Sequence, residues 1–429
     1  MTRFVKRLAW IGAVSVLVAG LPAMDVAQAA SQPAGPGAGT PHVSGLAGGR
    51  QGFLYGVSFR SATSGWAVGL SCAPNCQRGA QDTLIQHWTG TSWSRVASPS
   101  PSPIEGLFSV SDVSARDAWA VGSYGTRDDG FDTLILHWNG ARWSKVASPD
   151  PGKAPYGLHV LNAVTGVSAR NAWAVGYYCL RHCQGDGEVD ATLILHWNGR
   201  RWSTIASPAP SASHSILSGV AAVSARNAWA AGTYTTRAGN IDTLILHWNG
   251  VTWSRVASPD PHPGDNQLLG VTAVSARNAW AAGSFCVRRC QQSGEVDHTL
   301  ILHWNGASWS RVASPGAGTG AGGVDVLSGV TGGSARNAWA VGYSCAKRCE
   351  PVSAGAADGR TLILHWNGAR WSRVASPNPG QGENNLSGTS AISATGAWAV
   401  GTTCTTSCGN GTVFHPLILR WTGARWSTG

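Results

Sequence analysis

Beyond its first residues, the sequence has none of the features of a membrane-spanning or lipid-anchored protein. After the apolar run from Leu8 to Leu21, no stretch approaches the roughly 18 to 20 apolar residues needed to cross a bilayer. The small-x-small sequence Ala27-Gln28-Ala29 has no cysteine beside it that could carry a lipid. We therefore expect no membrane span and no lipid anchor in the rest of the chain.

Helical periodicity is also missing. No long segment places apolar residues at the 3.6-residue spacing of an amphipathic helix, so we expect few helices or none.

The first 50 residues instead have the pattern of an exported protein. Arg3, Lys6 and Arg7 precede the apolar run, and the small-residue signal follows it. This predicts a signal peptide over residues 1–29 and a secreted, extracellular product. Residues 30–50 are rich in Gly, Pro and Ser, which is typical of a flexible leader.

The remaining residues repeat one unit seven times. An Ala/Gly-Trp-Ala-x-Gly motif recurs at intervals of 51 to 59 residues, with its tryptophan at Trp66, Trp119, Trp173, Trp229, Trp280, Trp339 and Trp398. Repeats of about this length that contain four short strands and a recurring Trp are typical of propellers. The sequence therefore predicts an all-β fold over residues 51–429, a seven-bladed β-propeller with four-stranded antiparallel blades, which we expect to be monomeric.

The second copy shows the expected blade. Strands are predicted over Leu107 to Ser114, Ala118 to Tyr124, Thr133 to Trp138 and Trp143 to Ser148, with the hairpin signal Asn139-Gly140 before the last of them. A β-solenoid is the alternative, but its coils have fewer strands per repeat. The last copy ends at Gly429, short of a full fourth strand, so the leader around His42 to Ser44 is expected to complete blade seven.

The hairpin sequence Gly-x-x-Trp, as in Gly140-Ala141-Arg142-Trp143, resembles the end of the Asp-box (BNR) of sialidase-like and sortilin-like propellers. The resemblance is partial, because Trp138 and Leu136 stand where an Asp-box has Asp and Ser/Thr. It implies the turn geometry and not the enzymatic role. Kelch-like propellers share the four-stranded copy but have no matching motif here.

Ten cysteines form five Cys-x-x-x-Cys pairs in the loops between the second and third strands. They are Cys72/Cys76, Cys179/Cys183, Cys286/Cys290, Cys345/Cys349 and Cys404/Cys408. In an exported chain this spacing indicates five local disulfides, since a redox motif would have two intervening residues. Because so short a loop gains little from closure, we expect the bridges to fix loop shape rather than hold the fold together.

Two further patterns invite a metal interpretation. A histidine precedes the third-strand Trp in six copies, at His87, His137, His196, His247, His303 and His365, and Arg420 replaces it in the seventh. These residues lie on separate blades, so a packing role is favoured. Asp186-x-Glu188-x-Asp190 and Glu295-x-Asp297 could bind calcium, but they match no known calcium loop and are interpreted as solvated acids.

Catalytic patterns are not found. The innermost strands read Leu-Tyr-Gly-Val-Ser, Leu-Asn-Ala-Val-Thr and similar, with Asp112 as nearly their only ionisable residue. Without paired carboxylates, a nucleophile with its base, or a ligand set, the sequence predicts no catalytic residues, no metal and no cofactor. A propeller glycosidase or polysaccharide lyase is therefore the least favoured function.

Two faces are expected on the ring. One carries the variable disulfide-bearing loops, and recognition sites are usually built on such loops. The candidate ligand-binding residues there are Arg127, Arg181, Arg237, Arg288, Arg289, Lys347 and Arg348. The other face carries tight turns rich in arginine. The favoured function is a non-enzymatic adhesion module for an extracellular protein or glycan, with a sugar-specific lectin as the alternative. An anionic cell-envelope polymer is a further candidate partner, and nucleic acid is not expected.

Overall fold

The computed structural model describes residues 50–429 apart from 74–79, 152–156, 184–186, 209–213, 291–294, 317–322, 347–358, 381 and 405–412. The expected signal peptide and all of the leader except Arg50 lie outside the described residues. Throughout the described part, regular structure consists of strands, and no helix there could cross a membrane.

Twenty-eight strands form seven blades of four. The blades in chain order are β1 (Gln51–Ser61), β2 (Ser64–Cys72), β3 (Gln81–Trp88) and β4 (Trp93–Val96); β5 (Glu105–Ser114), β6 (Asp117–Gly125), β7 (Phe131–Trp138) and β8 (Trp143–Lys145); β9 (His159–Ser168), β10 (Asn171–Arg181), β11 (Val189–Trp197) and β12 (Trp202–Thr204); β13 (Ser215–Ser224), β14 (Asn227–Thr235), β15 (Ile241–Trp248) and β16 (Trp253–Val256); β17 (Asn266–Ser275), β18 (Asn278–Arg288), β19 (Val296–Trp304) and β20 (Trp309–Arg311); β21 (Val324–Ser334), β22 (Asn337–Cys345), β23 (Arg360–Trp366) and β24 (Trp371–Arg373); and β25 (Asn384–Ser393), β26 (Gly396–Cys404), β27 (Phe414–Trp421) and β28 (Trp426–Thr428).

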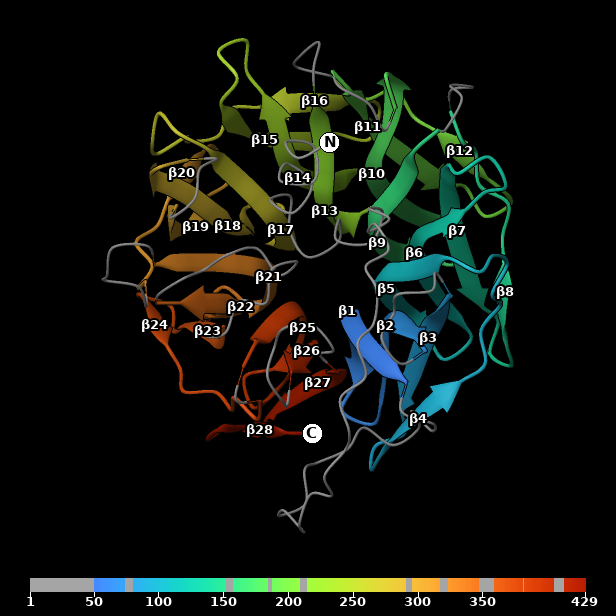
Figure 1. The fold of residues 1–429 in the computed structure, drawn as a ribbon. Coiled ribbons are helices and arrows are strands. Elements are labelled where there is room, and N and C mark those ends of the chain that lie inside the picture. The colour runs from blue at the N-terminus through green and yellow to red at the C-terminus, as the bar shows by residue number, and fades with distance from the viewer. Residues whose placement is uncertain are drawn as a thin grey trace, which may run out of the picture.

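The blades are arranged in a closed ring, as predicted (Figure 1). Each is an antiparallel meander, and two neighbouring blades are joined into one eight-stranded sheet by a single parallel pair, Asp297 with Val324. The first strand of each blade lies next to the central axis and the fourth lies at the rim. The chain travels once around the ring, so that blade seven, in red, lies beside blade one, in blue. The chain is a seven-bladed β-propeller.

The innermost strands approach one another closely. Each carries a bulge after its first leucine, for example between Leu54 and Gly56. A Cβ on Gly56 would lie 2.8 Å from Ser109 Cα of the next blade, so only glycine fits there. Hydroxyl groups then link five of the blade junctions by accepting a hydrogen bond from a backbone N–H of the neighbouring innermost strand. The acceptors are Ser58, Ser111, Thr272, Thr331 and Ser390.

Tryptophans fill the space between blades, as expected. The second-strand Trp119 is 1% exposed and lies between two indoles of blade three. Its ring centroid is 4.9 Å from that of Trp197 and 5.1 Å from that of Trp202. The same triad recurs at every junction, with second-strand indoles 0 to 3% exposed. Such pairs stabilise by about 0.5 to 1.5 kcal/mol beyond the burial of their area.

Within the described residues, blades seven and one meet through side-chain packing. Trp398 of blade seven packs against Trp88 and Trp93 of blade one, and Phe59 is stacked on it at 4.8 Å. The expectation that blade seven lacks part of its fourth strand is wrong, because β28 has three residues, as do β8, β12, β20 and β24. Of the expected strand Trp143 to Ser148, β8 contains the first three residues, and the Val146 N–H after it still donates to the Ile135 carbonyl of β7 at 2.9 Å. The residues His42 to Ser44 lie outside the described part.

Candidate functional site

The loop face carries the connections between second and third strands and between successive blades. Of the candidate cations there, Arg127 and Arg237 lie in the β6–β7 and β14–β15 loops, Arg181 and Arg288 end β10 and β18, and Arg289 follows β18. All five are exposed. They come from four different blades, so the structure distributes them around this face, and only Arg288 and Arg289 are neighbours. Lys347 and Arg348 lie outside the described residues.

Two of the expected disulfides are fully described. Cys179 is bonded to Cys183 and Cys286 to Cys290, with Cα atoms 5.7 and 5.6 Å apart. The described cysteines Cys72, Cys345 and Cys404 are disulfide-bonded as well, while Cys76, Cys349 and Cys408 lie outside the described residues.

Both described bridges hold an unusual backbone. The residue before the second cysteine, His182 in one loop and Arg289 in the other, has φ of 55°. This left-handed conformation is rare for residues other than glycine. The same torsion occurs at Asp129 in the β6–β7 loop, which has no cysteine, so it is not specific to the bridged turn. Each bridged loop presents two adjacent exposed polar side chains, Arg181 with His182 and Arg288 with Arg289.

The acids of these loops are not solvated, which corrects the sequence interpretation. Glu188, Asp190, Glu295 and Asp297 are only 3 to 6% exposed. The reason is that the third strands start earlier than expected, at Val189 in β11 and at Val296 in β19. Asp190 therefore pairs with Cys179 across the sheet, and Asp297 pairs with Cys286. Asp186 lies outside the described residues.

In each of these two clusters a sulfur atom and two carboxylates lie within 4.8 Å of one another, Cys179 with Glu188 and Asp190 and Cys286 with Glu295 and Asp297. The sulfurs belong to disulfides and are not thiolate ligands. Calcium takes roughly six to eight oxygen ligands. Two carboxylates do not make that shell, so we assign these acids no ion.

Burial changes the ionisation of these acids. Burial, followed by repulsion from Asp265 and Asp325, raises the pKa of Asp297 to about 7, although a hydrogen bond with Glu295 opposes the shift. In blade seven, burial likewise raises the pKa of Glu383 to about 7, against a 2.8 Å hydrogen bond that Asn385 Nδ2 donates. Asp190 Oδ2 lies 2.8 Å from His214 Nδ1.

A third group of possible ligands joins blades two and three. Atoms of Asp132, Asp150 and His159 lie within 4.8 Å of one another. Asp150 Oδ1 accepts hydrogen bonds from the N–H and hydroxyl of Thr133, both at 2.8 Å. His159 Nδ1 is 3.1 Å from the Phe131 carbonyl and Nε2 is 2.7 Å from that of Pro151. To bind a metal, His159 would have to offer the lone pair of one ring nitrogen, and the contact of that nitrogen with a backbone carbonyl would be lost. We therefore interpret Asp132, Asp150 and His159 as a polar junction between blades two and three.

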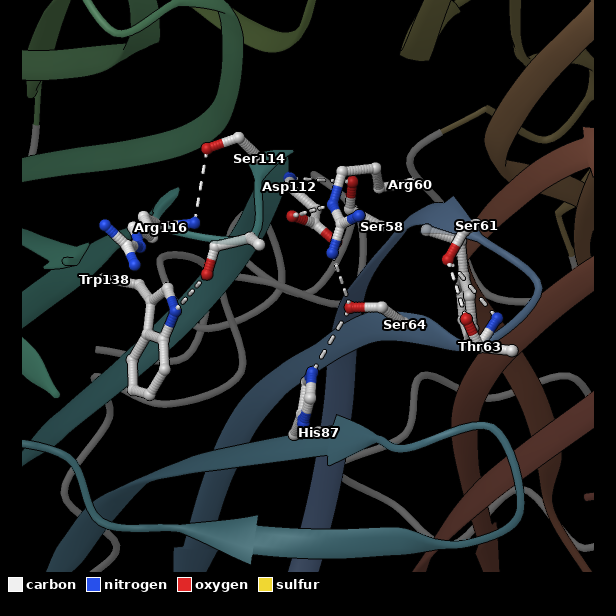
Figure 2. A network of polar contacts seen from close by, with 12 residues as sticks. Ser58, Arg60, Ser61, Thr63, Ser64, His87, Asp112, Ser114, Arg116 and Trp138 are labelled. Atoms are coloured by element: carbon white, nitrogen blue, oxygen red, sulfur yellow. Dashed lines mark hydrogen bonds and ion pairs between the residues drawn. The ribbon is translucent and has the colours of Figure 1, made fainter. Parts of the chain in front are cut away.

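Three acids lie on the innermost strands, Glu105 and Asp112 on β5 and Asp325 on β21, so these strands have more ionisable residues than expected. Asp112 is paired with a cation. Asp112 on β5 is 3.5 Å from Arg60 Nε on β1, and its side chain is 1% exposed. Figure 2 shows that Arg60 also contacts Ser64, which in turn contacts His87. Arg60 Nη2 donates to Ser64 Oγ at 3.0 Å, and Ser64 Oγ lies 3.4 Å from His87 Nε2. Burial raises the pKa of Asp112 to about 6, and the Arg60 charge opposes this. Asp112 is thus held mainly by the guanidinium of Arg60, while the nearby Asp117 carboxylate adds to the upward shift of its pKa.

The repeated histidines pack against the second-strand tryptophans of their own blades, with the two rings tilted by 30 to 37°. Ring centroids are 4.2 to 4.3 Å apart, as for Trp119 with His137. His137 Nε2 is also 2.8 Å from Asp117, the residue two before Trp119, and His365 makes the same contact with Asn337. Burial lowers the pKa of His87, His196, His247, His303 and His365. These contacts are those of packed, hydrogen-bonded residues.

The opposite surface, which we call the turn face, consists of the turns between first and second strands and the hairpins between third and fourth strands. All of these turns are described. They carry ten exposed arginines, namely Arg116, Arg142, Arg170, Arg200, Arg201, Arg226, Arg277, Arg336, Arg370 and Arg425. Arg60 lies beside them at the end of β1. None of these described turns contains an acid, and Asp117, which follows one of them at the start of β6, is 6% exposed.

Comparisons with known proteins give no family. No family model matches the chain, and no curated protein matches it significantly. Among solved structures, "YCF48 bound to D1 peptide" is 12% identical, covering 87% of this chain and 92% of that chain, with a TM-score of 0.46. YjhT is 10% identical over 75% of this chain and 97% of that one (TM-score 0.44). A Dyadobacter fermentans protein of unknown function is 11% identical over 87% and 95% (TM-score 0.45).

The sequence did not reveal the buried loop acids, the Arg60–Asp112 pair or the His159 junction. One signal was available for the acids. Asp190 and Asp297 lie two residues before Thr192 and Thr299, which begin the Thr-Leu-Ile-Leu-His-Trp strand, so extending that strand backwards would have placed them within the sheet. No comparable signal marks Asp112 and Arg60, because they come from different repeats and each interrupts its own repeat pattern.

Proposed function

We propose that this chain is a secreted, non-enzymatic binding module that recognises an extracellular protein or glycan through its loop face. A β-propeller provides a rigid ring on which loops of different sequence are displayed side by side. The cystine-bridged loops agree with an oxidising, extracellular location.

The observation that supports this most is the shape of the two bridged loops. Arg181 with His182, and Arg288 with Arg289, are exposed on turns held by a disulfide with one left-handed residue each. A side chain presented on a fixed loop loses less conformational entropy on binding than one on a mobile loop. Their cations suit a partner with carboxylate, sulfate or phosphate groups.

The buried acids support the same view. Glu295 and Asp297 lie under the bridged loop and are 4 and 3% exposed, so they leave the exposed surface of the loop to the arginines. These acids therefore do not compete with the arginines for direct contact with a ligand at the loop surface.

A binding comparison between variants tests the proposal. The mature protein would be applied to a glycan array and to immobilised extracellular proteins, and the strongest ligand found would be titrated. Arg288→Ala with Arg289→Ala should weaken binding at least tenfold. A matched control, Arg277→Ala with Arg336→Ala, removes two arginines from the turn face and should change it less than threefold. The opposite result would refute the loop-face assignment, and turnover of a polysaccharide would refute the non-enzymatic one.

A further inference from the structure

The turn face has a charge distribution unlike that of the loop face. Its ten turn arginines and Arg60 are exposed, while Asp117 is buried against His137 and Asp112 is buried against Arg60. No exposed carboxylate lies within these turns, all of which are described. On the loop face, by contrast, Arg127 is followed at once by the exposed Asp128 and Asp129. The turn face therefore attracts anions without local cancellation.

Five of these arginines are held in the same way. In blades two to six, the arginine of the first turn lies over the glycine of the hairpin in its own blade, whose φ is 90 to 99°. A Cβ on those glycines would lie 2.7 to 3.1 Å from the Arg side chain, and the pairs are Gly140 with Arg116, Gly199 with Arg170, Gly250 with Arg226, Gly306 with Arg277 and Gly368 with Arg336. The stems of the arginines thus occupy the space that a side chain would fill.

The turn beneath each arginine is fixed as well. In blade two, Ser114 Oγ accepts a hydrogen bond from the Arg116 N–H at 3.3 Å, and Trp138 Nε1 donates to the Ala115 carbonyl at 3.1 Å (Figure 2). Both bonds recur in blades three to six. Five consecutive blades therefore present one guanidinium each, on the same rigid turn. Blades one and seven have Thr63 and Thr395 there.

We infer that this row of arginines binds a linear polyanion with phosphate groups repeated along its chain. A row of equivalent cations along an arc matches a flexible chain of equivalent anions, and each guanidinium can bind two phosphate oxygens at once. Several weak contacts along one chain combine through effective concentration into useful affinity. This second site is separate from the loop-face site and does not depend on it.

A membrane surface fits the same charges less well. Of the large apolar side chains in the described residues, only Val223 and Val251 are exposed on the turn face, and both belong to blade four. The third-strand indoles, which could anchor in an interface, are packed against neighbouring tryptophans and bonded to turn carbonyls, as Trp138 is. Binding to lipid would then depend on charge alone, and not on insertion.

The test measures binding of long-chain inorganic polyphosphate to the mature protein at low and at high salt. The variant Arg226→Gln, Arg277→Gln and Arg336→Gln should bind at least tenfold more weakly at low salt and should show a shallower salt dependence. The matched control removes three arginines from the rim of the same blades, Arg255→Gln, Arg311→Gln and Arg373→Gln. It should retain affinity within threefold, and the melting temperature of each variant would verify folding.

Three results would overturn the inference. Equal losses in the two triple variants would show that net charge alone is responsible. Unchanged binding in the turn variant would move the site elsewhere. Tighter binding to phosphatidylglycerol vesicles than to polyphosphate, at equal phosphate concentration, would assign the face to a membrane. None of these results bears on loop-face binding, which the Arg288 and Arg289 variant measures separately.

Discussion

Arg420 occupies the position that a histidine holds in the six other blades, and the contacts explain the exchange. In those blades the residue two positions before the second-strand Trp has a polar side chain. This side chain lies within hydrogen-bond distance of the histidine in five of the six blades, which are the blades of His87, His137, His196, His247 and His365. In blade seven that residue is Gly396, which has no side chain to offer. Arg420 instead lies over the rings of Trp398 and Trp88, at 5.1 and 5.5 Å. The exchange thus replaces a hydrogen bond with a cation–π contact.

The titration of Asp297 should make the stability of the folded protein depend on pH. Its pKa is about 7 in the folded state, against roughly 3.9 in an unfolded chain, so the folded state binds the proton more tightly. The contribution of Asp297 is therefore most favourable below pH 4 and is lost as the pH rises towards 7. Asp297→Asn removes this dependence, while the amide oxygen of the asparagine can still accept a hydrogen bond from Glu295. We expect the melting temperature of the variant, relative to wild type, to increase from pH 5 to pH 8.

The exposed Asp128 provides the control for that measurement. Asp128→Asn should follow the wild-type melting curve at every pH. A constant difference between Asp297→Asn and wild type over the whole range would show that Asp297 is already ionised at pH 5.

Each bridged loop has a disulfide and exposed cations within a few residues of buried carboxylates. Cys286 and Arg288 lie at the end of β18, and Arg289 and Cys290 follow it. Asp297 pairs with Cys286 because β19 begins early. The bridged loop and the early start of the third strand are thus connected by the pairing of Cys286 with Asp297. A change in the loop should affect recognition more than folding.

Removing one bridge tests whether the disulfides fix loop shape rather than hold the fold together. Closure of so short a loop contributes about 2 kcal/mol in the chain-entropy model. Cys286→Ser with Cys290→Ser should therefore lower the melting temperature only by a few degrees, yet increase proteolytic cleavage within residues 286–295. Non-reducing peptide mapping of the wild type should find all five bridges within single peptides. A cross-blade peptide, or unfolding of the double variant at 25 °C, would contradict the local, shape-fixing role.

The triads between blades should matter far more for stability. Trp280 is 1% exposed and lies 5.0 Å from Trp366 and 5.3 Å from Trp371. Trp280→Ala leaves a cavity at a junction that cannot collapse without moving a blade, so we expect a loss of about 3 to 5 kcal/mol in denaturant unfolding. Val251→Ala, at a side chain that is 79% exposed, should remain within about 0.5 kcal/mol of wild type. Similar losses for the two would show that the triads are not the main junctions.

For the whole molecule, the repeats were enough to predict the blade count and the strand order. Seven copies of one Trp motif, each with a hairpin signal, allow few arrangements in which both faces of each sheet are buried. Contacts unique to one junction could not be predicted this way. Asp112 stands where other repeats have small or aromatic residues, and its partner Arg60 lies in a different repeat. Burial of Glu188 and Glu295 depends on where a strand starts, and strand ends are the least certain part of a sequence prediction.

The junction between blades seven and one should depend on side-chain packing. Every described strand of blade seven comes from the last repeat, and its junction with blade one uses the stacking of Phe59 on Trp398 together with a 3.0 Å hydrogen bond from Phe59 N–H to Ser390 Oγ. Deleting residues 31–48 should therefore leave the melting temperature of the mature protein unchanged, because the described contacts of this junction all come from the repeats. Phe59→Ala should lower it clearly, since Phe59 fills space that small residues such as Gly166 and Gly332 occupy at other junctions. If the deletion destabilises the protein as much as Phe59→Ala does, closure by side-chain packing alone is refuted, and the leader must contribute to the ring.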